Sequence, residues 1–353
     1  MGINERCDDT QMMEEIMANY KITKSKAMLC GAAAAAMITT VFSAHAMDIK
    51  KPAGFATRPL TMIVPYGAGG GSDQLARAMA NAMDKVADIQ FQVVNKPGGG
   101  GTAAIPDFML APADGYTVME HIDNAVSAYA KGDIRENPAK DWVPICTTQI
   151  TFSQIYVRPD DDRFGSWDDV VSYAKANPGK LTMANLGKVG SMELVVMHQL
   201  QDALGIKVKQ IAFDKPAERY GALIGGQVDV LFEQPGDVRS FLDAGTMKPV
   251  LTFLDSRPDV FADVPTHIEA GADFDALTRF RGFYVKKGVP QDRLSFLQQA
   301  CEAGFEEESY AAFNKKKYMH LIDSYRDTQG SIDLINGAVD TYRAMYKQLG
   351  IGQ

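Results

Sequence analysis

The chain has 353 residues, 46% of them hydrophobic, which is enough to bury the cores of about two domains. Its formal net charge is −8 and its basic residues form no dense cluster, which argues against a nucleic-acid partner. The acidic balance favours solubility but says little about a ligand, because a local pocket can carry the opposite sign.

The N-terminus has the pattern of a secretory leader. Lysines at 21, 24 and 26 form a positive region, and residues 27–43 carry no charge. This apolar run is barely long enough to span a bilayer, and it ends at Ala44-His45-Ala46, which fits the small-residue cleavage rule. We therefore expect residues 1–46 to be a leader, with cleavage after Ala46 and export of the mature chain to the periplasm.

Two of the four cysteines would leave with this leader. Cys146 and Cys301 remain, far apart in sequence and without a pairing motif. An oxidising compartment would permit a disulfide between them, but two buried free thiols are the favoured interpretation.

The first part of the mature chain predicts alternating strands and helices. The expected elements, in chain order, are at 60–64, 73–85, 91–94, about 102–110 and 115–120. A glycine-rich turn follows each of the first two strands, at Gly67–Gly71 and Pro97–Gly101, and Ser72 is expected to cap the first helix. This βαβαβ order is typical of a parallel sheet covered by helices.

A second set of elements begins after Trp142. Strands are expected at 154–157, 181–184, 207–213, 228–232, 249–253 and 281–285. Helices are expected at 166–176, 192–204, 218–224, 235–244, 291–305 and 330–349. No simple linker interrupts the chain, which indicates two α/β lobes joined by strands that pass between them. We expect 57–148 with 271–353 to form one lobe and 149–270 to form the other.

The two glycine-rich turns are the main chemical signal. Each lies at the carboxyl end of a parallel strand and opens a helix, which is where open α/β sheets bind ligands. Glycine lets a ligand approach the backbone, and a helix N-terminus offers free N–H groups with a partial positive charge. The turns therefore predict a site for anionic oxygens, with glycines that serve only tight turning as the alternative.

Nucleotides, metals and covalent catalysis have little support. The first turn lacks the third glycine of a dinucleotide fingerprint, and neither turn is followed by the Lys-Ser or Lys-Thr of a P-loop. None of the five histidines is paired with another histidine or a cysteine at ligand spacing. Ser191 opens a helix, where a cap or a ligand hydrogen bond is the favoured role. We expect no cofactor, no metal and no catalytic residue.

Several ordered segments carry a more specific resemblance. They are Arg58-Pro59-Leu60 with Ile63–Asp73, Val94–Gly101, Ala113–Thr117, Gly225–Val230, and Pro265-Thr266 with Glu269–Gly271. Together they resemble the Bug family, the periplasmic (TctC-like) substrate-binding proteins of tripartite tricarboxylate transporters. The resemblance extends from about Thr57 to the end of the chain. It implies a two-lobed Venus-flytrap fold, each lobe a mostly parallel sheet flanked by helices.

The resemblance also implies a function and a binding site. It implies a monomeric receptor that captures a small organic carboxylate and delivers it to the membrane subunits of the transporter. Backbone groups of the two glycine turns would hold the carboxylate, and the second lobe would add small polar side chains. The expected ligand-binding residues are Tyr66, Gly67, Ala68, Gly69, Gly70, Ser72, Gly99, Gly100, Thr102, Asp123, Asn124, Asn185, Lys188, Ser191 and Asp214. Asp73 is instead expected to stabilise its own helix.

Some positions depart from the family pattern and leave the ligand open. Asp123 in the cleft would repel a dicarboxylate and favour an ammonium group, with an exposed loop acid as an equal alternative. Lys188 would suit a distal carboxylate, although a solvated lysine is favoured. Glu233-Gln234-Pro235 and Arg279-Phe280-Arg281 also differ. The alternative functions are a ligand-sensing subunit for a signalling kinase and, less favoured, an enzyme acting on a carboxylate.

Overall fold

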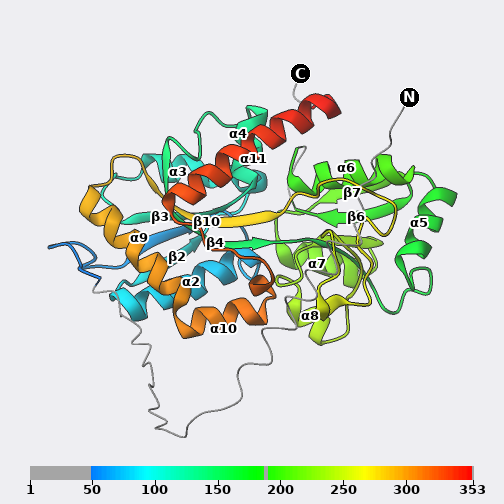
Figure 1. The fold of residues 1–353 in the computed structure, drawn as a ribbon, viewed down its shortest axis with the longest axis horizontal. Helices are drawn as coiled ribbons and strands as arrows, with labels where there is room; N and C mark the ends of the chain where they lie inside the picture. The colour runs from blue at the N-terminus through cyan, green and yellow to red at the C-terminus, as the bar shows by residue number, and fades with distance from the viewer. Residues whose placement is uncertain (1–48, 187–189, 352–353) are drawn as a thin grey trace, which may run out of the picture. The chain divides into compact units, whose positions relative to one another are not determined.

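The computed structural model describes residues 49–351 except 187–189, so the predicted leader and Lys188 lie outside the described residues. The described chain contains two five-stranded sheets flanked by helices (Figure 1). The first sheet consists of β1 (Leu60–Val64), β2 (Phe91–Asn95), β3 (Thr117–Ile122), β4 (Trp142–Thr151) and β10 (Arg279–Lys286). The second consists of β5 (Gln154–Val157), β6 (Leu181–Asn185), β7 (Val208–Ala212), β8 (Val230–Glu233) and β9 (Lys248–Thr252).

One strand in each sheet runs against the other four. In the first sheet β1 pairs in parallel with β2 and β3, whereas β10 pairs antiparallel with β3 and β4. In the second sheet β6 pairs in parallel with β7 and β8, whereas β5 pairs antiparallel with β8 and β9. The reversed strands are the two that the chain enters on crossing between sheets, from β4 into β5 and from β9 into β10. This topology confirms the predicted fold of two lobes with mostly parallel sheets.

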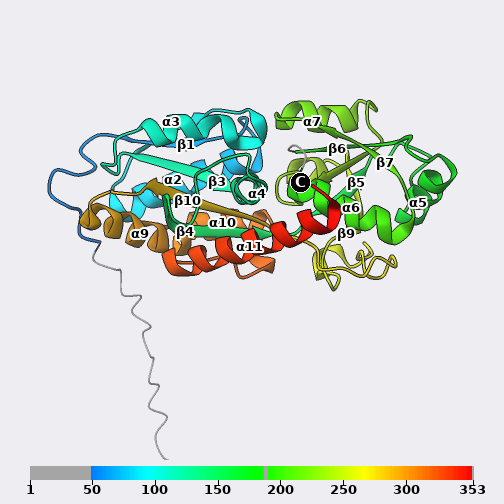
Figure 2. The ribbon, with the colours of Figure 1, turned by 90° about the horizontal axis from the view of Figure 1, so that it is seen from above.

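Helices cover the sheets. In chain order they are α2 (Gly71–Ala87), α3 (Ile105–Leu110), α4 (Asn124–Lys131), α5 (Trp167–Ala176), α6 (Met192–Leu204), α7 (Pro216–Ile224), α8 (Arg239–Asp243), α9 (Gln291–Glu306), α10 (Glu308–Lys316) and α11 (Thr328–Leu349). Short 3₁₀ turns are η1 (Gly99–Ala104), η2 (Asp259–Phe261) and η3 (Met319–Leu321). The helices α2 and α9 pack on each other, and α11 packs on α4 and β4 (Figure 2). None of the helices in the described ranges has the length and hydropathy that a bilayer crossing requires.

The helix α2 forms where its apolar periodicity predicts. Leu75, Ala76, Met79 and Met83 recur at helical spacing and are all buried in one hydrophobic core with β1 and α9. Burying such a side chain contributes about 1.5–3 kcal/mol. The helix nevertheless begins at Gly71, and the predicted capping by Ser72 is wrong. Because the helix starts two residues earlier than expected, the Ser72 side chain lies buried in the first turn and makes no capping bond.

A disulfide joins Cys146 of β4 to Cys301 of α9, so the favoured interpretation of two free thiols is wrong. The two residues are 155 apart in sequence, and their Cα atoms lie 6.5 Å apart in the fold. The packing of α9 on β4 brings them together, and no local pattern in the sequence carries that information. The bond ties a C-terminal helix to a strand that continues into the second lobe.

Candidate functional site

Residues from both lobes line a small cavity of about 20 Å³ at the carboxyl ends of the parallel strands. Tyr66, Gly70 and Ser72 come from the segment that follows β1. Asp214 and Gln234 come from the ends of β7 and β8 in the second lobe. The strand ends therefore converge as the sequence predicts for a site in an open α/β sheet.

The first glycine turn packs closely against the second lobe. Gly70 has an extended backbone (φ −80°, ψ 174°) that any residue can adopt. A Cβ atom there would nevertheless lie 2.6 Å from Cγ of Pro216. A Cβ atom at Gly71 would lie 2.2 Å from both carboxylate oxygens of Asp237. These glycines thus permit close approach of a second-lobe segment, rather than a special backbone angle.

The first glycine turn is also fixed by a hydrogen bond to Asp73 in the first lobe. The Gly69 N–H donates to Asp73 Oδ2 at 2.9 Å, and Arg77 Nε donates to Asp73 Oδ1 at 3.0 Å. Both contacts lower the pKa of Asp73 against the effect of burial, which alone would raise it. The expected local role of Asp73 is confirmed. Ala68 and Gly69 are exposed and lie away from the cavity.

The second glycine turn presents a backbone N–H to the second lobe. Gly100 has a left-handed backbone (φ 64°), and its N–H donates to Asp214 Oδ1 at 3.3 Å. Its carbonyl accepts from Asn124 Nδ2 at 3.2 Å and from the Tyr66 hydroxyl at 3.4 Å. A cavity of about 10 Å³ adjoins Gly100, Asn124, Thr102 and Ser191. The structure therefore brings these predicted residues together, with a carboxylate already bound to the turn.

Other predicted residues do not reach either cavity. Gly67 is buried against Pro216, and the carbonyl of exposed Gly99 accepts from Thr102 Oγ1 at 2.9 Å. Asn185 Nδ2 donates to Gln210 Oε1 at 2.8 Å, so its amide faces the neighbouring strand β7. Lys188 lies outside the described residues.

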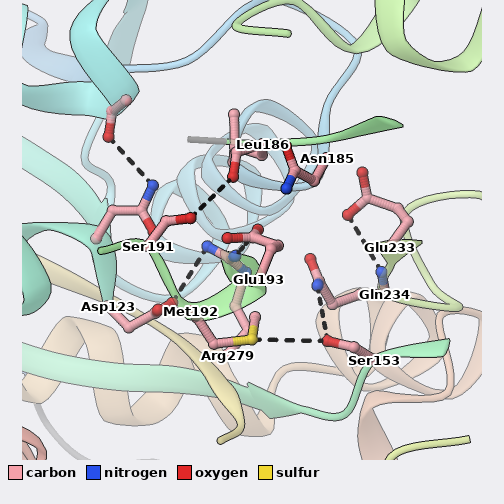
Figure 3. Close-up of polar contacts among 12 residues, drawn as sticks. Asp123, Ser153, Asn185, Leu186, Ser191, Met192, Glu193, Glu233, Gln234 and Arg279 are labelled. Carbon is pink, nitrogen blue, oxygen red and sulfur yellow. Dashed lines mark hydrogen bonds and ion pairs between the residues drawn. The ribbon is translucent and has the colours of Figure 1, made fainter. Parts of the chain in front are cut away.

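Asp123 is not an exposed loop acid, so that alternative is wrong. Only 1% of the residue is exposed, and Oδ1 forms an ion pair with Arg279 Nη1 at 3.2 Å. The Tyr342 hydroxyl donates to Oδ2 at 3.0 Å. Arg279 also pairs with Glu193 at the start of α6, so one guanidinium from β10 lies between two acids (Figure 3). The residues next to Asp123 in the sequence do not indicate these partners, because the contacts are long-range.

Two further buried ion pairs lie beside the first cavity. Arg281 of β10 pairs with Asp237, donates to Gln149 Oε1, and lies 3.4 Å from Gln234 Oε1. Arg219 Nε of α7 donates to Glu233 Oε2 at 2.9 Å. Burial alone would raise the pKa of Glu233, but Arg219 outweighs that effect and holds it below the usual value.

Glu120 differs from the other buried acids of this cluster because it has no arginine partner among the described residues. It lies in β3 with none of its surface exposed. Among the described residues neither carboxylate oxygen has a well-aligned hydrogen bond, although a hydrogen bond from Ser72 lowers its pKa. Burial raises its pKa to about 8, against the opposing charge of Arg281. Burial likewise raises the pKa of Glu193 to about 7, against Arg279. The site thus holds carboxyl groups that are protonated near neutral pH.

The family described as "Tripartite tricarboxylate transporter family receptor" matches residues 75–351. The chain belongs to this family. A Cupriavidus necator protein of the UPF0065 group is 27% identical over 303 residues, covering 85% of this chain and 90% of the relative. Among solved structures, the periplasmic binding protein BugD superposes with a TM-score of 0.74 at 23% identity, covering 84% of this chain and 98% of that one. Rpa4515 of R. palustris, solved with adipate, gives 0.76 at 20% identity, covering 84% and 99%.

Membership of this receptor family agrees with the resemblance that the glycine turns carry, and the family is one of binding receptors. Most of the buried charges of this site could not be predicted from the sequence. Glu120 stands in an otherwise largely apolar strand, which was an available signal. Arg279, Arg281 and Glu233 were recognised as departures from the family pattern but not as parts of a site. The remaining members, Glu193, Arg219 and Asp237, lie on helical or turn segments without any local signal.

Proposed function

We propose that the protein is a periplasmic receptor that captures a small organic carboxylate and delivers it to the membrane subunits of a tripartite tricarboxylate-type transporter. The observation that carries the proposal is the bond from the Gly100 N–H to Asp214 Oδ1. It supports a turn whose backbone binds a carboxylate oxygen without any cationic side chain. The adipate in the structure of a similar protein supports the same ligand class.

The ligand in this proposal replaces the carboxylate of Asp214. Its oxygens bind at Gly100, and Thr102, Asn124 and Ser191 supply polar groups at the adjoining cavity. Ser72 and Tyr66 line the neighbouring cavity, which would receive the rest of the ligand. Both cavities are too small for a carbon chain, so binding requires Asp214 and its segment to withdraw.

The proposal extends to processing and domain organisation. Cleavage after Ala46 would release a monomeric mature chain into the periplasm. One lobe would comprise 57–148 with 271–353, and the other 149–270. These boundaries are supported by the crossings at β4–β5 and β9–β10. N-terminal sequencing of a periplasmic extract tests the cleavage, and recovery of the uncleaved chain from membranes alone would contradict it.

Titration calorimetry against mono-, di- and tricarboxylates and amino acids tests the central function. The Asp214→Asn variant should bind the same ligand several-fold more tightly, because a competing anion has been removed from Gly100. Glu218→Gln, which removes an exposed acid that pairs with Lys215 at 2.9 Å on the same segment, is the control. A protein that binds no carboxylate, or an Asp214→Asn variant that binds more weakly than the control, would contradict the proposal.

A further inference from the structure

The buried charges of the site do not balance. Each of the acids and bases concerned is at least nine-tenths buried. The carboxyl groups are Glu120, Asp123, Glu193, Glu233 and Asp237, and the guanidinium groups are Arg219, Arg279 and Arg281. Lys317, which is partly buried, adds one positive charge beside Asp237. Counting it, the described part of the cluster still holds one carboxyl group more than its bases can neutralise.

The pairings leave Glu120 as the one carboxyl group of the described cluster without an ion pair. Arg219 binds Glu233, Arg281 binds Asp237, and Arg279 lies between Asp123 and Glu193. Glu120 forms no ion pair with any residue in the described ranges, and Ser72 is the one described side chain that contributes a hydrogen bond to it. Leaving a buried carboxylate unpaired costs several kcal/mol, so the group must either hold a proton or meet a cation that the described residues do not supply.

Glu120 lies next to the ligand cavity. In the β3–β10 pairing Ile122 is opposite Arg281 and Glu120 is opposite Phe283, so Glu120, Ile122 and Arg281 share one face of the sheet. Ile122 and Arg281 both line the cavity of about 20 Å³, together with Ser72 and Asp237. Glu120 also interacts electrostatically with two residues that line this cavity, because Arg281 lowers its pKa and Asp237 raises it. The unpaired acid therefore lies beside a space of the size of one water molecule or one ammonium group.

We propose that the ligand is an amino-carboxylate, with its carboxylate on the second glycine turn and its ammonium group in the cavity beside Glu120. This assignment rests on the proposed receptor function and narrows its ligand class. An ammonium group supplies a positive charge and further hydrogen-bond donors to an acid that pairs with no described cation. Arg281 does not repel it strongly, because Asp237 already neutralises that guanidinium. The acid that recognises the ammonium group is thus Glu120, not Asp123.

Matched ligand pairs test this assignment. Calorimetry compares aspartate with succinate, glutamate with glutarate, and 4-aminobutyrate with butyrate, on the wild type and on Glu120→Gln. We expect the amino member of at least one pair to bind the wild type at least ten-fold more tightly than its partner. Glu120→Gln should lose that preference, whereas Glu218→Gln should retain it.

Proton release gives a readout independent of affinity. Titration of the amino ligand in two buffers of different ionisation enthalpy should show release of about one proton at pH 7 from the wild type, and none from Glu120→Gln. Equal binding within every pair, or a preference that survives in Glu120→Gln, would overturn the assignment. If only the plain carboxylates bind, the receptor function stands and this inference falls. If no member of any pair binds and no other carboxylate does, both fall together.

Discussion

Replacing Glu120 by glutamine should stabilise the protein at neutral pH. The side chain is fully buried, and burial raises its pKa from 4.5 to about 8. The folded state therefore holds a proton that the unfolded state releases above pH 4.5. Stability from this group is fully present below that pH and declines as the pH rises, until it levels off above about 8. Glutamine keeps the shape and a neutral charge at every pH.

The expected gain follows from the same two pKa values. At roughly 1.4 kcal/mol per pH unit, holding the proton at pH 7 costs about 3 kcal/mol of folding free energy, and at pH 5 about 1 kcal/mol. Urea unfolding followed by circular dichroism at pH 5, 6, 7 and 8 measures the difference between Glu120→Gln and the wild type. That difference should grow with pH, whereas Glu218→Gln should show a small and constant one. A Glu120→Gln difference that is flat across this range, or that shrinks as the pH rises, would refute the account of a protonated buried acid.

Three further outcomes follow from the packing of the site and the core. Arg279→Met leaves Asp123 and Glu193 buried without their cation, and should lower the free energy of unfolding by about 3–5 kcal/mol in urea at pH 7; a loss below 1 kcal/mol would contradict the pairing. The double variant Cys146→Ala, Cys301→Ala, which lacks the disulfide, should have a free energy of unfolding lower by about 5 kcal/mol at most, given the 155-residue separation of the two cysteines. A double variant as stable as the oxidised wild type would contradict the presence of the bond. Gly71→Ala should weaken ligand binding severely, because the added carbon would collide with Asp237. The control Gly337→Ala, in open space on α11, should leave the affinity unchanged. Equal affinity in both variants would show that close approach at Gly71 is not required.

Local periodicity and turn chemistry predicted the fold well. The strand β5 and the helix α6 begin and end where their apolar spacing places them, and the glycine turns lie at the carboxyl ends of β1 and β2. Prediction failed for elements that form only through contacts with residues far away in the sequence. The ten residues of β4 were not predicted as a strand, because β4 is an edge strand that pairs only with β10, more than 120 residues later in the chain. The short helices α4 and α10 were missed for the same reason.

The residues of the candidate site also fall into two groups, those that could be predicted from local motifs and those that could not. Gly100, Thr102, Asn124 and Ser191 were predicted from motifs that each lie in one stretch of sequence, and they meet at one cavity. The charged cluster depends on which strand face each residue occupies and on pairings across the two lobes. Asp123 illustrates the difference, since its partners Arg279 and Tyr342 are more than 150 residues away. A charged residue inside an apolar strand, such as Glu120, indicates a buried function but does not identify its partner.

The central claim is that the second glycine turn binds the ligand carboxylate through its backbone. A crystal structure of the mature protein with the carboxylate that binds most tightly in the calorimetric panel tests it most directly. The account predicts a ligand carboxylate oxygen within hydrogen-bond distance of the Gly100 N–H, with the Asp214 side chain displaced from its present distance of 3.3 Å. A ligand bound elsewhere, with Asp214 still accepting from Gly100, would contradict it.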